Sequence, residues 1–340
     1  METEPSALTA EIQLSEGCYQ AQYFPLSKGV YEVTPGLMAF GTDLGNGAAD
    51  RQLFQVDDHY APYRRAKLEA RAEALDKYYA THQYPPAVAG AVAAFVARRL
   101  AAEHPETFVL RQDDAGFTLQ CTPSREVLRF DRNWALTQAR PRIERGPDYA
   151  SALDALVCQV QEDLAVICRR GDSENWLAAL HLCFPNHWAA AEKIGKDFAA
   201  VHAPVPGIER LTQRSQALVD AMIDRGPYVR FVWGLSTDTR LNHHPQAPGE
   251  LPQWHGRRFD PQDPHLFLRV ERQVTWGLPE CDAALFAIRT YFADAAEVRR
   301  DPWRRDKLCS ALRSMSAAAQ EYKGIAANRE AALHWLQGGD

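Results

Sequence analysis

Three stretches in the second half of the chain decide the fold: Tyr228-Val-Arg-Phe-Val-Trp-Gly-Leu-Ser236, Leu266-Phe-Leu-Arg-Val-Glu-Arg-Gln-Val-Thr-Trp-Gly-Leu278 and Ala284-Leu-Phe-Ala-Ile-Arg-Thr-Tyr-Phe-Ala293. All three are rich in β-branched and aromatic residues, which favour strands. The four-residue turn 279–282 joins the last two stretches, and the long polar segment 237–265 separates the first two. We therefore predict three consecutive antiparallel strands.

The segments before these strands alternate between strand and helix patterns. The sequence predicts two hairpins, each with a turn rich in Asp, Gly or Ser between its two apolar runs. The hairpin strands are 107–111 with 117–122, and 164–169 with 176–185; helices are predicted at 62–80, 88–103, 149–163, 188–200, 208–225 and 301–322. Helices between two groups of strands indicate an α+β fold, and this order fits the outline of a PAS domain.

The chain divides by pattern into three parts. Residues 1–105 read as an irregular segment followed by helices that wrap a core, 106–295 as a PAS-like core, and 296–340 as a helical extension at the C-terminal end. The predicted architecture is a PAS-like antiparallel sheet with helical extensions at both ends.

Composition excludes several classes of function. The 340 residues carry a net charge of -6, which argues against a nucleic-acid partner because such proteins present a basic face. Seven cysteines include no C-x-x-C pair, so a zinc or iron–sulfur site made by this chain alone is not expected. The chain begins without a signal-peptide pattern and lacks an apolar run long enough for a membrane span, so we expect a cytoplasmic protein with no membrane partner.

The common catalytic motifs are also absent. No G-x-G-x-x-G opens a helix, and neither a Walker A sequence, a G-x-S-x-G elbow nor an H-E-x-x-H pair occurs. The sequence therefore gives no support for a nucleotide hydrolase, a serine hydrolase or a zinc peptidase.

The stretch from His181 to Gly207 carries the most distinctive chemistry. His202 lies where a predicted helix meets the proline-rich turn 203–207, with Phe198 and Val201 before it and Val205 after it. An imidazole held in an apolar wall suits an axial haem ligand, which must offer one neutral nitrogen beside a flat apolar slot. The alternative is a histidine that caps the helix and bonds locally.

Several stretches together resemble the haem-dependent oxidative N-demethylase α-subunit family. They span roughly residues 20 to 325, and the most specific are the octapeptide 266–273 and the Lys193-x-Gly195…His202-x-Pro204-Val pattern. The others are Leu53-Phe-Gln-Val-Asp57 with Tyr60 and Tyr63-Arg64, Leu182–Trp188, Arg230…Trp233, and Phe286-Ala-Ile-Arg-Thr-Tyr291. The chain departs from the pattern expected of the family at Val232, where we expect an asparagine.

This resemblance implies a haem monooxygenase subunit. The implied fold is PAS-like, the cofactor is haem b with its iron, and the reaction is O2-dependent oxidation of a small secondary amine such as dimethylamine, releasing formaldehyde. Electrons would come from reductase partner subunits that carry FMN and a [2Fe–2S] cluster, and a folate-binding subunit would complete the assembly. The Val232 departure puts the identity of the amine in doubt more than the cofactor.

The resemblance also assigns the site. His202 becomes the metal ligand, because haem PAS proteins take it from the helix before the last three strands. Arg230 is assigned to catalysis over bound O2 and to cofactor binding. Glu271 is also assigned to catalysis, although the alternation of the strand by itself favours a solvated outer face for Glu271. The cationic side chains expected to meet the haem propionates are Lys193, Arg230, Arg269 and Arg289, with Arg272 as a further candidate.

Some alternatives stay open at this point. His181, His187, His244 or His265 could replace His202 as the ligand, and residues 237–265 are long enough to form a lid over a distal pocket. The chain could also be a haem gas sensor or a scaffold that has lost haem, since a fold does not fix a function. A sensor is normally fused to an output module, and no such module is evident here.

Overall fold

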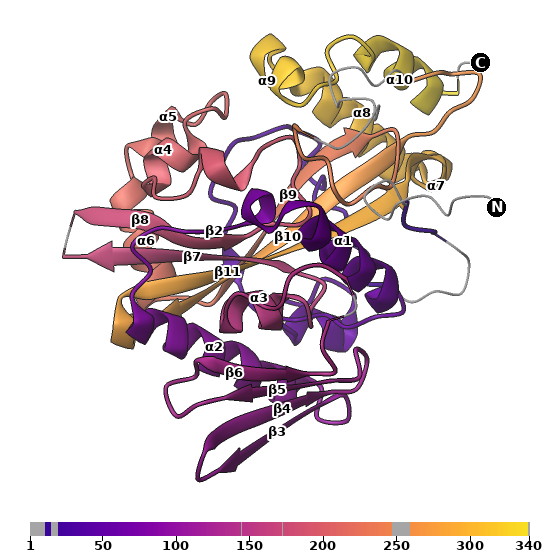
Figure 1. Cartoon of the computed structure of the whole chain (residues 1–340). Coiled ribbons are helices and arrows are strands. Elements are labelled where there is room, and N and C mark those ends of the chain that lie inside the picture. The colour runs from indigo at the N-terminus through magenta and orange to yellow at the C-terminus, as the bar shows by residue number, and fades with distance from the viewer. Residues whose placement is uncertain (1–10, 15–19, 144, 172, 247–258, 339–340) are drawn as a thin grey trace.

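The computed structural model describes residues 11–14, 20–143, 145–171, 173–246 and 259–338 (Figure 1). These residues form two antiparallel sheets and a set of helices, which confirms the α+β prediction. The order of strands in the larger sheet is β1-β9-β10-β11-β7-β8-β2. Its strands are β1 (Met38–Ala39), β2 (Tyr79–Thr81), β7 (Asp163–Arg170), β8 (Glu174–His181), β9 (Tyr228–Ser236), β10 (Phe267–Leu278) and β11 (Ala283–Asp294).

The three stretches that decide the fold are the strands β9, β10 and β11. β10 lies between the other two and pairs with both, with Glu271 opposite Val232 on one side and opposite Thr290 on the other. β11 then pairs with β7, and β7 with β8, so the predicted hairpin 164–185 joins the same sheet. The short strands β1 and β2 come from the first 105 residues and lie at the two edges.

The smaller sheet contains β3 (Phe108–Asp113), β4 (Gly116–Cys121), β5 (Glu126–Phe130) and β6 (Leu136–Arg140) in that order. Its first hairpin is as predicted, but β5 and β6 replace what the sequence suggested was a loop. The sequence of β5 does not show the usual alternation of apolar and polar residues, because one of its inward-facing residues is Glu126. This buried carboxylate forms an ion pair with Arg64 at 2.6 Å. The boundaries predicted at residues 105 and 295 stay a prediction.

Helices cover the sheets as Figure 1 shows, with α2 between the two sheets and α8, α9 and α10 grouped at one end of the larger sheet. The α-helices are α1 (Tyr60–Tyr78), α2 (Pro86–Glu103), α3 (Ala152–Val157), α4 (Phe198–His202), α5 (Glu209–Thr212), α6 (Ser215–Asp224), α7 (Ala295–Arg300), α8 (Pro302–Ser314), α9 (Ala317–Tyr322) and α10 (Arg329–Leu336); the 3-10 helices are η1 (Gly47–Arg51), η2 (Ala190–Glu192) and η4 (Pro279–Cys281). No helix in the part of the chain that the structure describes is long and apolar enough to cross a membrane.

Two predicted helices are much shorter than expected because tertiary hydrogen bonds compete with helix formation. In the stretch predicted as 149–163, α3 ends at Val157, and the following side chains of Gln161 and Glu162 accept hydrogen bonds from the backbone of residues 57 and 55. In the stretch predicted as 188–200, the backbone of residues 195–196 bonds to Leu177 in β8. Only η2 and α4 remain helical there, so Lys193 follows a 3-10 turn instead of lying in a helix.

The two faces of the larger sheet have different roles. On the face that meets α2, the central strands present fully buried residues such as Val274, Leu285 and Ala287, which form one core with α2 and the smaller sheet. Further along the same face, Leu268 and Val270 form a second core with α7, α8 and α10. The opposite face is covered by α4 and α6, and these helices shield it only partly from solvent.

Candidate functional site

A partly exposed strip crosses the middle of the sheet face that α4 and α6 cover. At one end α6 approaches so closely that a Cβ on Gly277 would collide with the carbonyl oxygen of Ile223. At the other end Arg269 bonds to Arg240 and Leu241 of the segment 237–246, in which residues 239–244 are buried. Between these ends lie six side chains of intermediate exposure, which we call the open strip: Arg230, Val232, Glu271, Gln273, Phe286 and Ile288.

His202 ends α4 and its environment keeps the imidazole neutral. Its Nδ1 lies 2.8 Å from the carbonyl oxygen of Phe198, which can only accept, so Nδ1 carries the proton and donates it. Burial lowers the pKa of His202 to about 4, and the neighbouring cations Lys193 and Arg230 add to this effect. No residue that the structure describes bonds to Nε2, so a neutral nitrogen lone pair is available there, as a metal ligand requires.

The other candidate histidines are already engaged or poorly placed. His181 is fully buried and uses both nitrogens, Nε2 with Asp154 at 2.9 Å and Nδ1 with the Cys183 thiol at 3.6 Å. The ring of His187 stacks on His243, and His265 is largely exposed. Nδ1 of His244 accepts a hydrogen bond from the backbone of residue 246, while its Nε2 is enclosed.

Three of the predicted polar residues gather around His202 and the open strip. Lys193 donates a hydrogen bond to the carbonyl oxygen of Val201, and burial lowers its pKa although Glu271 opposes that shift. Arg230 makes no hydrogen bond or ion pair with any described residue, its Nε is buried, and burial lowers its pKa. Gln273 holds Glu271 at 3.1 Å. The structure thus brings the carboxylate of Glu271 and two partly buried cations, Lys193 and Arg230, to the same face of the sheet.

Arg269 lies on this face, but its guanidinium is already hydrogen-bonded within the protein. Its guanidinium donates to the carbonyl oxygens of Phe184, Arg240 and Leu241, and only 2% of the residue is exposed. Its Nε lies 4.0 Å from Glu271, at the limit of an ion pair. Arg269 therefore fixes the segment 237–246 against the sheet. Of the predicted lid, 237–265, these bonds hold residues 240 and 241 against the sheet, and Phe259 is buried. Residues 247–258, which include His255, lie outside the described residues.

Arg289 and Arg272 lie on the opposite face. Arg272 in β10 is paired with Arg289 in β11, and the next pair along the strands is Glu271 with Thr290. Because successive side chains of a strand point to opposite faces, the two arginines face away from Glu271. Arg289 is fully buried and bonds Asp57 at 2.8 Å, and Arg272 donates to the carbonyl oxygen of Gln52. Both hold the N-terminal segment onto the sheet, so the structure does not bring them to the open strip.

Lys323 also reaches this region, although nothing in the sequence points to it. It follows α9, its ammonium bonds the carbonyl oxygen of Trp233, and burial lowers its pKa with further lowering by Arg230 and Arg269. The residue comes from the C-terminal extension, far along the chain from the strands that it meets. No local motif marks it, so only the tertiary structure reveals it.

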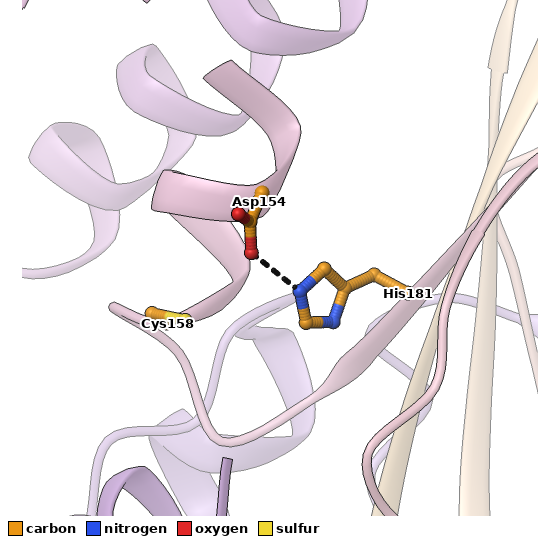
Figure 2. A group of neighbouring side chains, drawn as sticks. All are labelled: Asp154, Cys158 and His181. Carbon is orange, nitrogen blue, oxygen red and sulfur yellow. Dashed lines mark hydrogen bonds and ion pairs between the residues drawn. The ribbon is translucent and has the colours of Figure 1, made fainter. Parts of the chain in front are cut away.

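A second cluster of potential metal ligands lies in the core. Asp154 of α3, Cys158 directly after α3 and His181 of β8 place their donor atoms within 4.8 Å of one another (Figure 2). Arg71 already binds both oxygens of Asp154, at 2.7 and 2.8 Å. Burial raises the pKa of the Cys158 thiol to about 12, so this thiol does not supply the thiolate that metals prefer. The cluster is better explained as a buried ion pair, and it lies on the other side of the sheet from the open strip.

Comparison with known families adds an independent observation. The sequence model of the family described as haem-dependent oxidative N-demethylase, alpha subunit-like, matches residues 46–333. This range includes α4, the open strip and Lys323, and it covers most of the chain.

Proposed function

Because the chain belongs to the haem-dependent oxidative N-demethylase α-subunit-like family, we propose that the open strip and α4 enclose haem b with His202 as the iron ligand. The loaded protein would oxidise a small secondary amine of the dimethylamine type with O2 and release formaldehyde. The observation that carries the proposal is His202 itself, a neutral imidazole with a bonded Nδ1 and an available Nε2 beside a partly exposed sheet face.

The topology supports a PAS-like interpretation. Strands β7 and β8 come first in the chain, helices α4 to α6 follow, and β9 to β11 complete the sheet with β11 beside β7. Two strands, a helical connection and three strands, with the last strand inserted next to the first, is the outline expected of a PAS domain. The helical connection supplies His202, and the last three strands supply the open strip.

The residues present fit a haem group. A macrocycle needs apolar contacts on both sides, and Phe286, Ile288 and Val232 on the sheet and Val201 on α4 provide them. Propionates need cations, and Arg230 is a partly buried guanidinium without any anionic partner in direct contact. Lys193 is a second cation beside His202. An unpaired buried charge is costly, so a bound anion would relieve a cost that the free protein carries.

The chemistry of the site divides between the cofactor and the chain. Haem, when bound, would supply the activation of O2 that side chains cannot provide. Glu271 would hold the ammonium form of the amine and accept its proton, and Gln273 would fix the orientation of that carboxylate. Val232 and Ile288 would contact the N-methyl groups and exclude water, so the charge of Glu271 acts in a medium of low dielectric constant.

Electron supply is the part of the proposal that depends on partners. The described cysteines are separate free thiols, and five of the six are buried. A family named for an α subunit implies an assembly of several subunits. We therefore place FMN and the [2Fe–2S] cluster on reductase partners, and the folate that would accept formaldehyde on another subunit.

The direct test is an absorption spectrum followed by an amine screen. Purified protein supplied with haem should show a Soret band that shifts when dithionite and CO are added. The reduced, loaded protein should then release formaldehyde from dimethylamine or a close relative in the presence of O2. A Soret band without formaldehyde from any amine would favour a gas sensor, and the lack of any Soret band would leave a scaffold.

Haem affinity should depend on pH in a way that reports the ligand. A proton and iron compete for Nε2 of His202, and burial lowers the pKa of this imidazole to about 4. Affinity should therefore stay level from pH 8 down to about 5 and decline only as the pH approaches 4, whereas an ordinary histidine would already compete near pH 6.5. Haem titrations followed at the Soret band, with circular dichroism as a check on folding, would measure this profile. A decline between pH 7 and 6 would point to another histidine.

The variant Glu271→Gln should separate catalysis from cofactor binding. The amide keeps the shape of the side chain but removes the negative charge that holds the ammonium and accepts its proton. We expect an unchanged Soret band and a rate of formaldehyde release lower by roughly 100-fold. The matched control is Glu192→Gln, which removes an exposed carboxylate next to Lys193 and should leave the rate unchanged. Equal losses in both variants would contradict the assignment of Glu271.

A further inference from the structure

Two opposite charges stand side by side on the open strip without neutralising each other. Glu271 in β10 is opposite Val232 in β9. The next position on the same face pairs Arg230 with Gln273, so the two charged residues are diagonal neighbours, which long side chains can bridge. Glu271 is nevertheless bonded by Gln273, and its only ion pair among the described residues is with Arg269 at 4.0 Å. Arg230 bonds to no described residue. The strip therefore offers an anion and a cation to a ligand that carries both charges.

Cations outnumber anions around this strip. The charge of Glu271 raises the pKa values of four cationic side chains, against the lowering effect of burial: Lys193, Arg230, Arg269 and Lys323. Three further carboxylates act on these four, and each is matched by one cation: Asp238 by Arg240, Asp163 by Lys67, and Glu192 by Lys196. An ammonium ion without a negative group would therefore enter a region with an excess of positive charge, where like charges repel.

Haem propionates would offset part of this excess but would not use every donor of Arg230. A guanidinium has five N–H donors, and a carboxylate accepts two of them in a bidentate pair. Arg230 donates to none of the described residues, and its Nε is buried. A substrate without a carboxylate would leave buried donors unpaired, and polar sites discriminate strongly against such ligands. The geometry therefore favours a substrate that brings its own carboxylate.

We propose that the preferred substrate is a zwitterion, an N-methyl amino acid of the N-methylglycine type, with its ammonium at Glu271 and its carboxylate at Arg230. The inference rests on the proposed function and narrows the substrate class of that same site. In an α-amino acid a single carbon joins the two charged groups, so the molecule is short enough to lie between diagonal neighbours of a sheet. Val232, which is opposite Glu271, would contact the N-methyl group.

Demethylation of such a substrate needs no co-reactant beyond O2 and the reductase partners. N-methylglycine, O2, two electrons and two protons give glycine, formaldehyde and water. The bond between the nitrogen and the methyl carbon breaks, and that carbon is oxidised and keeps one oxygen atom of O2. The other oxygen atom is reduced and leaves as water, with the two electrons supplied by the reductase partners.

The first test compares three ligands on the haem-loaded full chain. N-methylglycine carries both charges, N-methylglycinamide keeps the ammonium but has no carboxylate, and dimethylamine is the bare amine. Calorimetry should show that N-methylglycine binds at least about tenfold more tightly than either of the others, because only its carboxylate forms a charged hydrogen bond with Arg230. The values of kcat/KM for formaldehyde release should follow the same order.

The variant Arg230→Gln assigns the preference to this residue. It should remove the preference for N-methylglycine over the amide without weakening the binding of dimethylamine, measured at equal Soret absorbance so that a change in haem uptake does not enter. The matched control Arg111→Gln removes an exposed arginine of the smaller sheet and should keep the preference. Equal affinity of the wild type for N-methylglycine and its amide, or a preference that survives Arg230→Gln, would overturn the proposal.

The ligand series needs no variant, so it decides the proposal even if Arg230→Gln does not fold. Formaldehyde from dimethylamine but not from N-methylglycine would overturn this inference and keep the proposed function. The lack of a Soret band would refute the proposed function, and calorimetry on the haem-free chain would then decide whether the strip prefers the zwitterion.

Discussion

Replacing His202 by alanine is expected to remove the iron ligand while leaving the fold intact. The imidazole bonds only to Phe198 within its own short helix and is partly exposed, so its loss should cost about 1 kcal/mol of unfolding free energy. Haem affinity should fall by more than roughly 100-fold, since even changes to the groups around a metal ligand cost up to that much. The measurement is a haem titration at the Soret band, with urea denaturation to confirm the small change in stability.

A matched control and a rescue make the result specific. His244 has the same lowered pKa of about 4, yet its Nε2 is enclosed, so His244→Ala should keep the wild-type spectrum. Imidazole added to His202→Gly should restore part of the wild-type spectrum by occupying the vacated position. A Soret band that survives in His202→Ala and is lost in His244→Ala would transfer the ligand role to the segment 237–246.

The main sheet could be predicted from the sequence because its strands are long and strongly patterned. β9, β10 and β11 are each nine residues or longer, and the turn at 279–282 fixes which two are neighbours. The alternation in β10 also placed Glu271 and Gln273 on one face and Arg272 on the other, as found. The alternation of side chains along a strand and the length of a turn are local properties, so they can be read from a single sequence.

The features that the sequence did not predict depend on contacts between segments that are far apart along the chain. The helix predicted at 188–200 is interrupted because residues 195–196 bond to β8, and β5 was missed because a buried ion pair with Arg64 makes Glu126 an inward residue. Arg230 lies between Val229 and Phe231, and Arg289 lies between Ile288 and Thr290, and these neighbours do not reveal which face each arginine occupies. Only the paired register shows that Arg289 faces Asp57 on the other side of the sheet and Arg230 faces the open strip.

Among the substitutions described for this protein, Asp154→Asn should lower the free energy of unfolding the most. Asp154 is fully buried and accepts hydrogen bonds from both arms of the Arg71 fork, from His181 and from the backbone N–H of Ala150. The asparagine leaves the Arg71 guanidinium buried without its counter-charge, which costs about 3–5 kcal/mol. Urea denaturation of Asp154→Asn would measure the loss. The control is Asp148→Asn, which breaks an exposed ion pair with Arg142 of similar geometry and should leave the free energy of unfolding almost unchanged.

The same residue predicts how stability responds to acid and to metals. Burial opposes the ionisation of Asp154, but hydrogen bonds from His181 and Arg71 outweigh it and lower the pKa from 3.8 to about 2. Its contribution of roughly 2 kcal/mol is therefore complete above about pH 4 and is lost as the pH falls toward 2. Because Arg71 already neutralises this carboxylate, neither zinc nor a chelator should change the melting temperature of the haem-free protein. A rise of several degrees with zinc would mean that Asp154, Cys158 and His181 bind a metal after all, with Arg71 displaced.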